Sequence, residues 1–144
     1  MSISPVRFIP HEMKTTLVRV YSYENKTLQG TLSNPYFEKD MVFENVMQFI
    51  TLMEHIADSL VFPQNAMQLR QFPNGKQKKT GFGFTTSADF SEKNPLATFA
   101  VEILFRQNAS WQGSVTLSEQ NASASFRSLL ELLMLMDGVL SETA

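Results

Sequence analysis

Residues 106–113 read RQNASWQG, and residues 23–30, a shift of 83 positions toward the N-terminus, read YENKTLQG. Extending the comparison places residues 15–57 over residues 98–140 without a gap, with eight identical positions where average composition gives roughly three. A fixed period of this kind indicates an internal repeat. The identical pairs are Thr15/Thr98, Val18/Val101, Asn25/Asn108, Gln29/Gln112, Gly30/Gly113, Phe43/Phe126, Leu52/Leu135 and Met53/Met136.

Both copies contain the pattern of a helix start. Asn45 is followed three positions later by Gln48, and Ser128 is followed three positions later by Glu131, the spacing of a capping box. Apolar residues then recur every three or four positions through 46–60, and a second helix is predicted from about 129 to 140.

Each predicted helix is preceded by three predicted strands. Their composition of Val, Ile, Leu and aromatic residues is typical of strands. The predicted ranges are 16–23, 29–33 and 41–43 in the first half, and 99–106, 112–118 and 124–126 in the second. Asn25 and Asn108 fall in short loops, where asparagine tolerates the left-handed conformation. Gly30 and Gly113 lie inside strands and predict a bulge or a close backbone approach.

These patterns predict one α+β domain, residues 1–144, made of a duplicated β-β-β-α unit. The repeats, 15–60 and 98–140, are joined by an inserted segment, 61–97, that has no counterpart. We expect a pseudo-two-fold arrangement with one antiparallel sheet and two helices on one face.

Composition narrows the functional classes. A chain of 144 residues can bury the core of one domain, and its net charge of −2 creates no field that would draw it to phosphate or to anionic lipid. The sequence has no cysteine, no apolar run long enough to span a membrane and no secretory signal pattern, which together favour a cytoplasmic protein.

The sequence carries no pattern of catalytic, metal-binding or cofactor-binding residues. Of the two histidines, His55 stands between Glu54 and Asp58 on a predicted helix, where a solvated helix edge is the simpler interpretation than a metal ligand. No arrangement of nucleophile and base is legible. We therefore expect no catalysis, no metal and no cofactor.

The stretch SLLELLMLMDGVL, residues 128–140, is apolar on nearly every side. Such a helix must be covered on more than one face. The first helix and the segment 61–97 could supply the cover, or two copies of the chain could join through helix 129–140.

The candidate binding residues combine aromatic, basic and amide groups. Arg106 and Trp111 differ from their counterparts Tyr23 and Leu28, so they are the part of RQNASWQG that a hairpin alone does not explain. The other candidates are Gln112, Lys76, Lys78, Lys79, Phe82 and Phe84. Rings of this kind can stack on bases while cations contact phosphate.

The segment 106–113, with Phe126-Arg127-Ser128, resembles a set of small uncharacterised bacterial proteins, a likeness that implies no activity. Each half is also similar in pattern, over about 43 residues, to the PUR repeat of single-strand nucleic-acid-binding proteins, in which a short curved sheet joins one helix and repeats pair two at a time. PUR repeats have one more strand, and their basic glycine-arginine hairpin is absent from 23–30 and 106–113.

Three functions follow from these observations. We favour a non-catalytic interaction or regulatory protein that contacts another protein or itself. The alternative is a single-stranded nucleic-acid or nucleotide-binding protein, as the PUR resemblance implies. The third is an enzyme at the junction of the halves, where Gln29 and Gln112 would orient a substrate rather than transfer protons.

Overall fold

The computed structural model describes residues 14–60, 82–106 and 110–143 of the chain. Their elements follow the order β1 (Thr15–Ser22), β2 (Gln29–Ser33), β3 (Met41–Phe43), α2 (Val46–Ser59), β4 (Ala97–Phe105), β5 (Gln112–Leu117), β6 (Ala122–Phe126) and α3 (Leu129–Thr143). A short 3-10 turn, Glu24–Lys26, connects β1 to β2. The predicted α+β class and the order of strands and helices are therefore confirmed.

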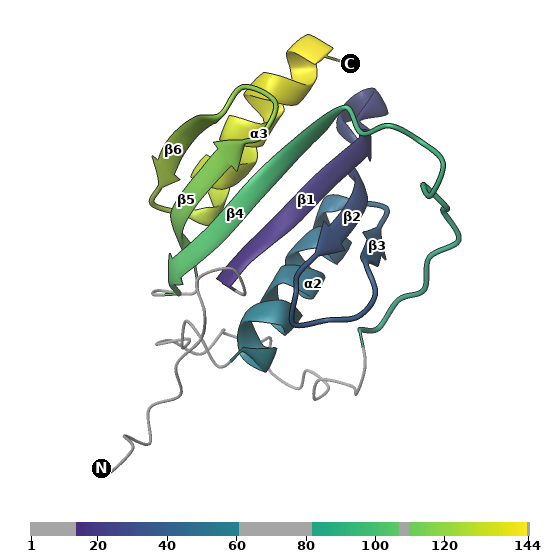
Figure 1. The fold of residues 1–144 in the computed structure, drawn as a ribbon, viewed down its shortest axis with the longest axis horizontal. Coiled ribbons are helices and arrows are strands. Elements are labelled where there is room, and N and C mark those ends of the chain that lie inside the picture. The colour runs from purple at the N-terminus through teal and green to yellow at the C-terminus, as the bar shows by residue number, and fades with distance from the viewer. Residues whose placement is uncertain (1–13, 61–81, 107–109, 144) are drawn as a thin grey trace, which may run out of the picture.

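The six strands form one antiparallel sheet in the order β3-β2-β1-β4-β5-β6 (Figure 1). β1 and β4, the first strand of each half, pair at the centre, where Leu17 lies opposite Ala100. The other strands extend the sheet outward on both sides in chain order. This order makes the β1–β4 ladder the only strand pairing in the described residues that joins the two halves.

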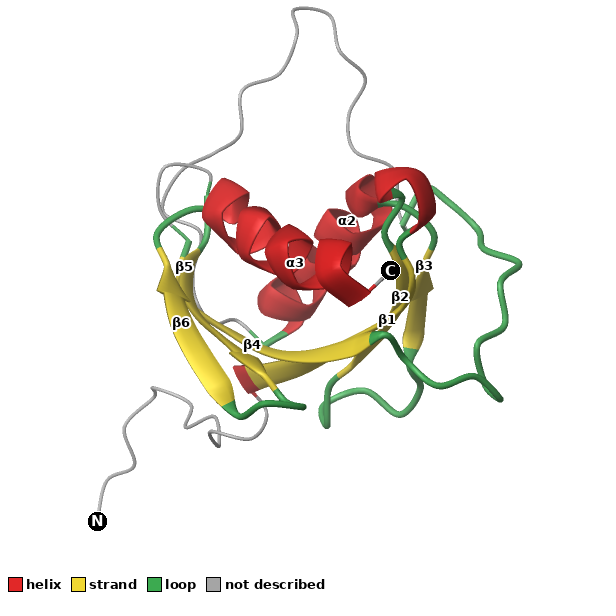
Figure 2. Cartoon of the chain, turned by 90° about the horizontal axis from the view of Figure 1, so that it is seen from above, coloured by secondary structure: helices red, strands yellow, loops and turns green. Residues whose placement is uncertain are grey.

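The sheet is curved, and both helices lie on its concave face (Figure 2). Alternate residues of β1 and β4 point to the helices, which is why Val18, Val20, Phe99 and Val101 are buried. Each helix adds its apolar stripe to the same core. From α2 the buried residues include Phe49, Leu52, Met53 and Ile56, and from α3 they are Leu132, Met136 and Leu140.

Both capping boxes form as predicted. The Asn45 side chain accepts from Gln48 N at 2.9 Å, while Gln48 Oε1 accepts from the N–H of Glu44 at 2.7 Å. In the second half Ser128 Oγ accepts from Glu131 N at 3.1 Å, and Glu131 Oε1 accepts from the Arg127 N–H at 2.7 Å. Each N-cap side chain satisfies one N–H group of the first helical turn, an effect of about 1 kcal/mol, and each reciprocal bond is donated by the residue before the N-cap.

The two strand glycines mark close backbone approaches. A Cβ atom on Gly30 would lie 2.0 Å from the Arg19 carbonyl oxygen, and one on Gly113 would lie 2.0 Å from that of Glu102. Next to each glycine the register of the strand pair is irregular. The shift lies between Val20 and Ser22 in β1, and between Ile103 and Phe105 in β4. Both glycines are therefore needed because any side chain would strike the neighbouring strand.

The hairpin turn of the first half also has the predicted conformation. Asn25 adopts a φ of 57°, in the left-handed region that asparagine tolerates. Its counterpart Asn108 lies outside the described residues.

Strand residues that pair in the first half correspond, 83 positions later, to residues that pair in the second half. Val20 pairs with Gly30 as Ile103 pairs with Gly113, and Gly30 pairs with Phe43 as Gly113 pairs with Phe126. At the centre the pair Thr15–Glu102 is matched by Arg19–Thr98. The segment 82–96, which has no counterpart, runs past β3 and enters β4 (Figure 1).

Candidate interaction surfaces

Arg106 and Trp111 form a buried anchor between the β4–β5 hairpin and helix α2. Arg106 Nη1 lies 2.9 Å from Glu54 Oε1 and 2.9 Å from Asp58 Oδ1, and the Arg106 side chain is only 4% exposed. The Trp111 indole N–H donates to the other Glu54 oxygen. Both Glu54 oxygens thus accept from the hairpin of the other half, and charge-assisted bonds of this kind are the strong class.

The burial of this anchor bears on the predicted binding role. Trp111 packs edge-on to Phe49, with ring centroids 6.3 Å apart, and is buried on all sides. A ligand could reach its ring, or the Arg106 guanidinium, only if α2 moved away from the hairpin. Gln112 follows as the first residue of β5 and is half-buried opposite Phe105.

The other hairpin carries a second anchor at the corresponding positions. Tyr23, the counterpart of Arg106, donates its hydroxyl to Asp137 Oδ1 at 2.6 Å, and Asp137 is the counterpart of Glu54. Lys26 Nζ lies 2.7 Å from the same oxygen and 3.0 Å from Ser141 Oγ. Each hairpin is therefore bonded to the helix of the opposite half.

The electrostatics of the second anchor follow from these contacts. Burial, the hydrogen bond to Asp137 and the charge of Asp137 raise the pKa of Tyr23 to about 12. The hydrogen bonds from Lys26 and Tyr23 hold the pKa of Asp137 below its ordinary value. Both shifts stabilise a neutral phenol beside a charged carboxylate, so this pair is set to remain bonded rather than to exchange a proton.

Phe82 and Phe84 belong to an aromatic cluster on the outer side of α2. The Phe82 ring lies 4.8 Å edge-on from His55 and 5.9 Å from Phe84, and His55 lies 5.7 Å from Phe37. His55 and Phe82 remain exposed. The histidine predicted to be a solvated helix edge is exposed and also serves as a packing surface for the segment 82–96.

The structure separates the predicted binding residues into two places. Arg106, Trp111 and Gln112 share one hairpin, while Phe82 and Phe84 contact the His55 side of α2. Lys76, Lys78 and Lys79 lie outside the described residues. Sequence reasoning missed Glu54 and Asp58 as the partners of Arg106, although two acids four positions apart on one helix could have suggested a cationic partner.

Helix α3 presents an apolar face that nothing in the described chain covers. Leu130 is 67% exposed and Met134 is 58% exposed, and Leu135 and Gly138 are exposed beside them. The opposite face, with Leu132, Met136 and Leu140, is buried on the sheet. Exposed apolar side chains that gather on one helix face indicate an interaction surface.

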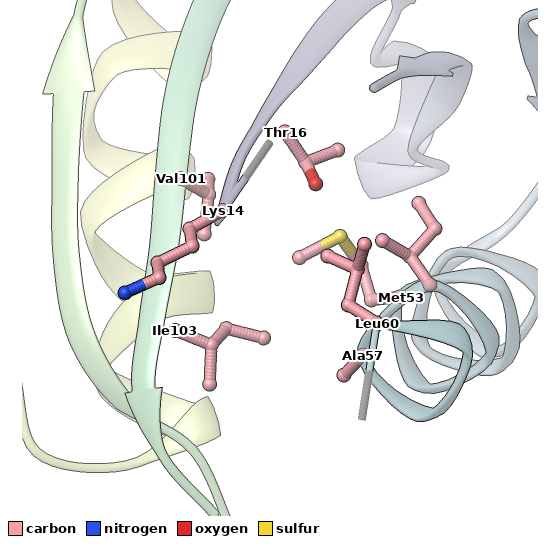
Figure 3. A pocket seen from close by; sticks show the side chains of 8 residues that line it. Lys14, Thr16, Met53, Ala57, Leu60, Val101 and Ile103 are labelled. Atoms are coloured by element: carbon pink, nitrogen blue, oxygen red, sulfur yellow. The ribbon is translucent and has the colours of Figure 1, made fainter. Parts of the chain in front are cut away.

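A small apolar pocket opens between α2 and the central strands (Figure 3). Its walls are Met53, Ile56, Ala57, Leu60, Val101 and Ile103, with Lys14 and Thr16 as the polar groups. In the second half the positions of Thr16 and Ala57 are held by the larger, buried Phe99 and Leu140. The pocket therefore lies where the first half has smaller side chains, and its lining holds no pair of acid and base.

Comparison with protein-family models, with curated proteins and with solved structures found no match to this chain. Neither helix in the described part of the chain has the length and apolar character that a membrane crossing requires. Within residues 14–60, 82–106 and 110–143, no three His, Asp or Glu side chains are grouped to hold a metal ion.

Proposed function

We propose that this protein is a non-catalytic interaction protein, with a regulatory role, that acts through protein–protein contacts. The observation that carries the proposal is the exposed apolar face of α3, defined by Leu130, Met134 and Leu135. Large apolar side chains exposed together lose contact with water when a partner covers them, which contributes about 25 cal/mol for each Å² of apolar area buried.

The use of the charged residues supports a non-catalytic role. Glu54 and Asp137, acids that a hydrolytic site could use, are each held by donors from the opposite hairpin. A general acid or base needs freedom to exchange a proton with substrate. In this protein the two acids bind the halves to each other instead.

We also propose that the chain arose by duplication of a β-β-β-α unit whose copies face each other about an approximate two-fold axis. The shift of 83 positions in the strand registers, the two glycines and the two capping boxes support this origin. The pair Leu17–Ala100 would lie on the axis, because a shift of 83 positions exchanges its two members. An experimental structure in which residues 15–57 and 98–140 superpose element by element would test it.

Site-specific photo-crosslinking in the native host tests the proposed contact surface. A photoreactive amino acid at position 134 should form a covalent adduct with a protein chain, either this one or another. The same amino acid at Ser123, an exposed polar residue of β6, provides the control and should give no adduct. Equal labelling at both positions, or none at 134, would refute the proposal.

Single-stranded nucleic-acid binding is the second candidate, favoured by the exposed rings of Phe82 and His55. Such rings can stack on bases without reading sequence. If this function is correct, the protein should bind a labelled oligonucleotide with an affinity that falls steeply as salt rises. The Phe82→Ala variant should lose this binding. Oligonucleotide binding that does not depend on Phe82 would leave the exposed rings without this role.

A further inference from the structure

Gly138 stands in the interior of α3, and nothing in the described residues requires a glycine there. Its φ is not in the left-handed region, and a Cβ atom placed on it would meet nothing within 4 Å. After proline, glycine is the least favourable residue in a helix interior. Gly30 and Gly113 are explained by a neighbouring strand, so the unexplained glycine of α3 indicates a close neighbour that is not among the described residues.

The side chains around Gly138 make a continuous surface. Met134 lies one turn before Gly138 and Leu130 lies one turn before Met134, and residues four apart share a helix face. All three are exposed. An exposed leucine at one end of this face and a glycine, which carries no side chain, near the other end supply the two halves of a knob-and-hole contact.

Helix α2 shows that the fold does not require a bare apolar face at these positions. The residues of α2 that correspond to Leu130, Met134 and Gly138 are Met47, Thr51 and His55. There the middle residue is polar, and the His55 ring packs against Phe37 and Phe82 of the chain itself. Gly138, the counterpart of His55 on α3, has no side chain, and the space around it is open.

We infer that a second copy of this chain covers the α3 face, with the two α3 helices packed antiparallel and Leu130 of each over Gly138 of the partner subunit. This inference rests on the proposed function and names its partner. A two-fold axis at Met134 brings Leu130 and Gly138 together because they lie four residues on either side of it. A surface that carries both the knob and the hole is self-complementary, as a two-fold dimer requires.

The charges on α3 select the antiparallel orientation. The exposed Arg127 precedes the helix and forms a solvated ion pair with Glu131 at 2.7 Å, and the exposed Glu142 lies in the last turn of the helix. An antiparallel pair places Arg127 beside the end that carries Glu142 of the partner subunit, whereas a parallel pair places like charges together. Opposed helix dipoles favour the same orientation.

Light scattering with matched variants tests the dimer. Wild-type protein should have the mass of a dimer at about 100 μM, and Leu130→Glu should raise the dissociation constant at least about tenfold. Met47→Glu is the control, since Met47 is 65% exposed at the corresponding position of α2, and it should leave the dimer unchanged. Gly138→Leu should fold, because the space around Gly138 is open, and should also weaken the dimer.

Disulfide trapping tests the orientation, because the chain contains no cysteine of its own. Met134→Cys lies at the proposed axis and should form a covalent dimer on mild oxidation. Leu130→Cys should not, because eight residues of helix separate the two copies by about 12 Å, beyond the reach of a disulfide. Rapid trapping of Leu130→Cys would overturn the antiparallel arrangement.

A wild-type monomer at this concentration would overturn the dimer. It would not decide the proposed function, because the crosslink from position 134 would still reveal whether a different protein binds the α3 face. An adduct to another protein with a monomeric chain would refute the second copy alone. A monomeric chain together with no adduct from position 134 would refute the proposal that the α3 face is an interaction surface.

Discussion

Removing the Glu54 side chain should show how strongly the β4–β5 hairpin is anchored to α2. In Glu54→Ala, the Arg106 guanidinium, 4% exposed, loses the Glu54 carboxylate and keeps its ion pair with Asp58, which is 56% exposed and largely solvated. The Trp111 indole N–H loses its acceptor in a buried position. The lost charged hydrogen bond contributes about 1.5–3 kcal/mol and the unsatisfied N–H costs about 1–3 kcal/mol. We expect a total loss of roughly 3–5 kcal/mol, the range seen when one partner of a buried ion pair is removed.

Urea denaturation and thermal unfolding would measure this loss. For a chain of this size the expected decrease in Tm is on the order of 10 °C. Glu54→Gln keeps an acceptor for Trp111 and should fall between wild type and Glu54→Ala. Asp58→Ala is the matched control on the same helix, and as a solvated ion pair it should cost less than about 1 kcal/mol. If Glu54→Ala were no more destabilising than Asp58→Ala, the hairpin would not be anchored as described.

The remaining predictions concern the second anchor and the glycines. Tyrosine absorbance during alkaline titration should show that the Tyr23 phenol ionises near pH 12. Asp137→Asn should lower the Tyr23 pKa only part of the way, because burial is the largest single cause of the raised pKa. Since the phenol pKa is raised by folding, the stability it contributes is full below its ordinary pKa of about 10 and is lost as pH rises through 12. The Asp137 pKa is lowered, so its contribution is present above about pH 4 and is lost as pH falls through the lowered value, which acid titration of wild type against Asp137→Asn would measure. Gly30→Ala and Gly113→Ala should each cost on the order of 4 kcal/mol, because the new Cβ strikes a carbonyl oxygen. Gly138→Ala should instead stabilise the monomer by about 1 kcal/mol in dilute thermal unfolding, since its site is open.

The elements of the fold could be predicted because their signals are local. The capping residues Asn45 and Ser128, with Gln48 and Glu131 three positions later, fixed the helix starts through hydrogen bonds that span one turn. The repeat then allowed each half to support the interpretation of the other. Gly30 and Gly113 correctly predicted a close approach of neighbouring strands, because a glycine inside a strand pattern is visible in the sequence.

The partners of Arg106 and Trp111 could not be predicted because they come from the other half of the chain. Arg106 and Glu54 are 52 positions apart, and only the packing of a hairpin on a distant helix brings them together. An arginine and a tryptophan close together in the sequence can belong either to a binding site or to a buried anchor. Burial distinguishes the two, and burial depends on tertiary structure.

The apolar excess of helix 129–140 was visible in the sequence, but its exposed face was not. Composition predicts that such a helix needs cover, and only the fold shows which residues the sheet leaves uncovered. Gly138 gave no signal in the sequence, because its meaning depends on the open space around it.

Amide hydrogen exchange across a protein concentration series would test the role of the α3 face most directly. Between about 1 and about 100 μM, exchange in a peptide covering Leu129–Thr143 should slow as the second copy binds, while exchange in Val46–Ser59 of α2 should not change. Exchange in α3 that does not depend on concentration, or that slows equally in α2, would contradict self-association through this face.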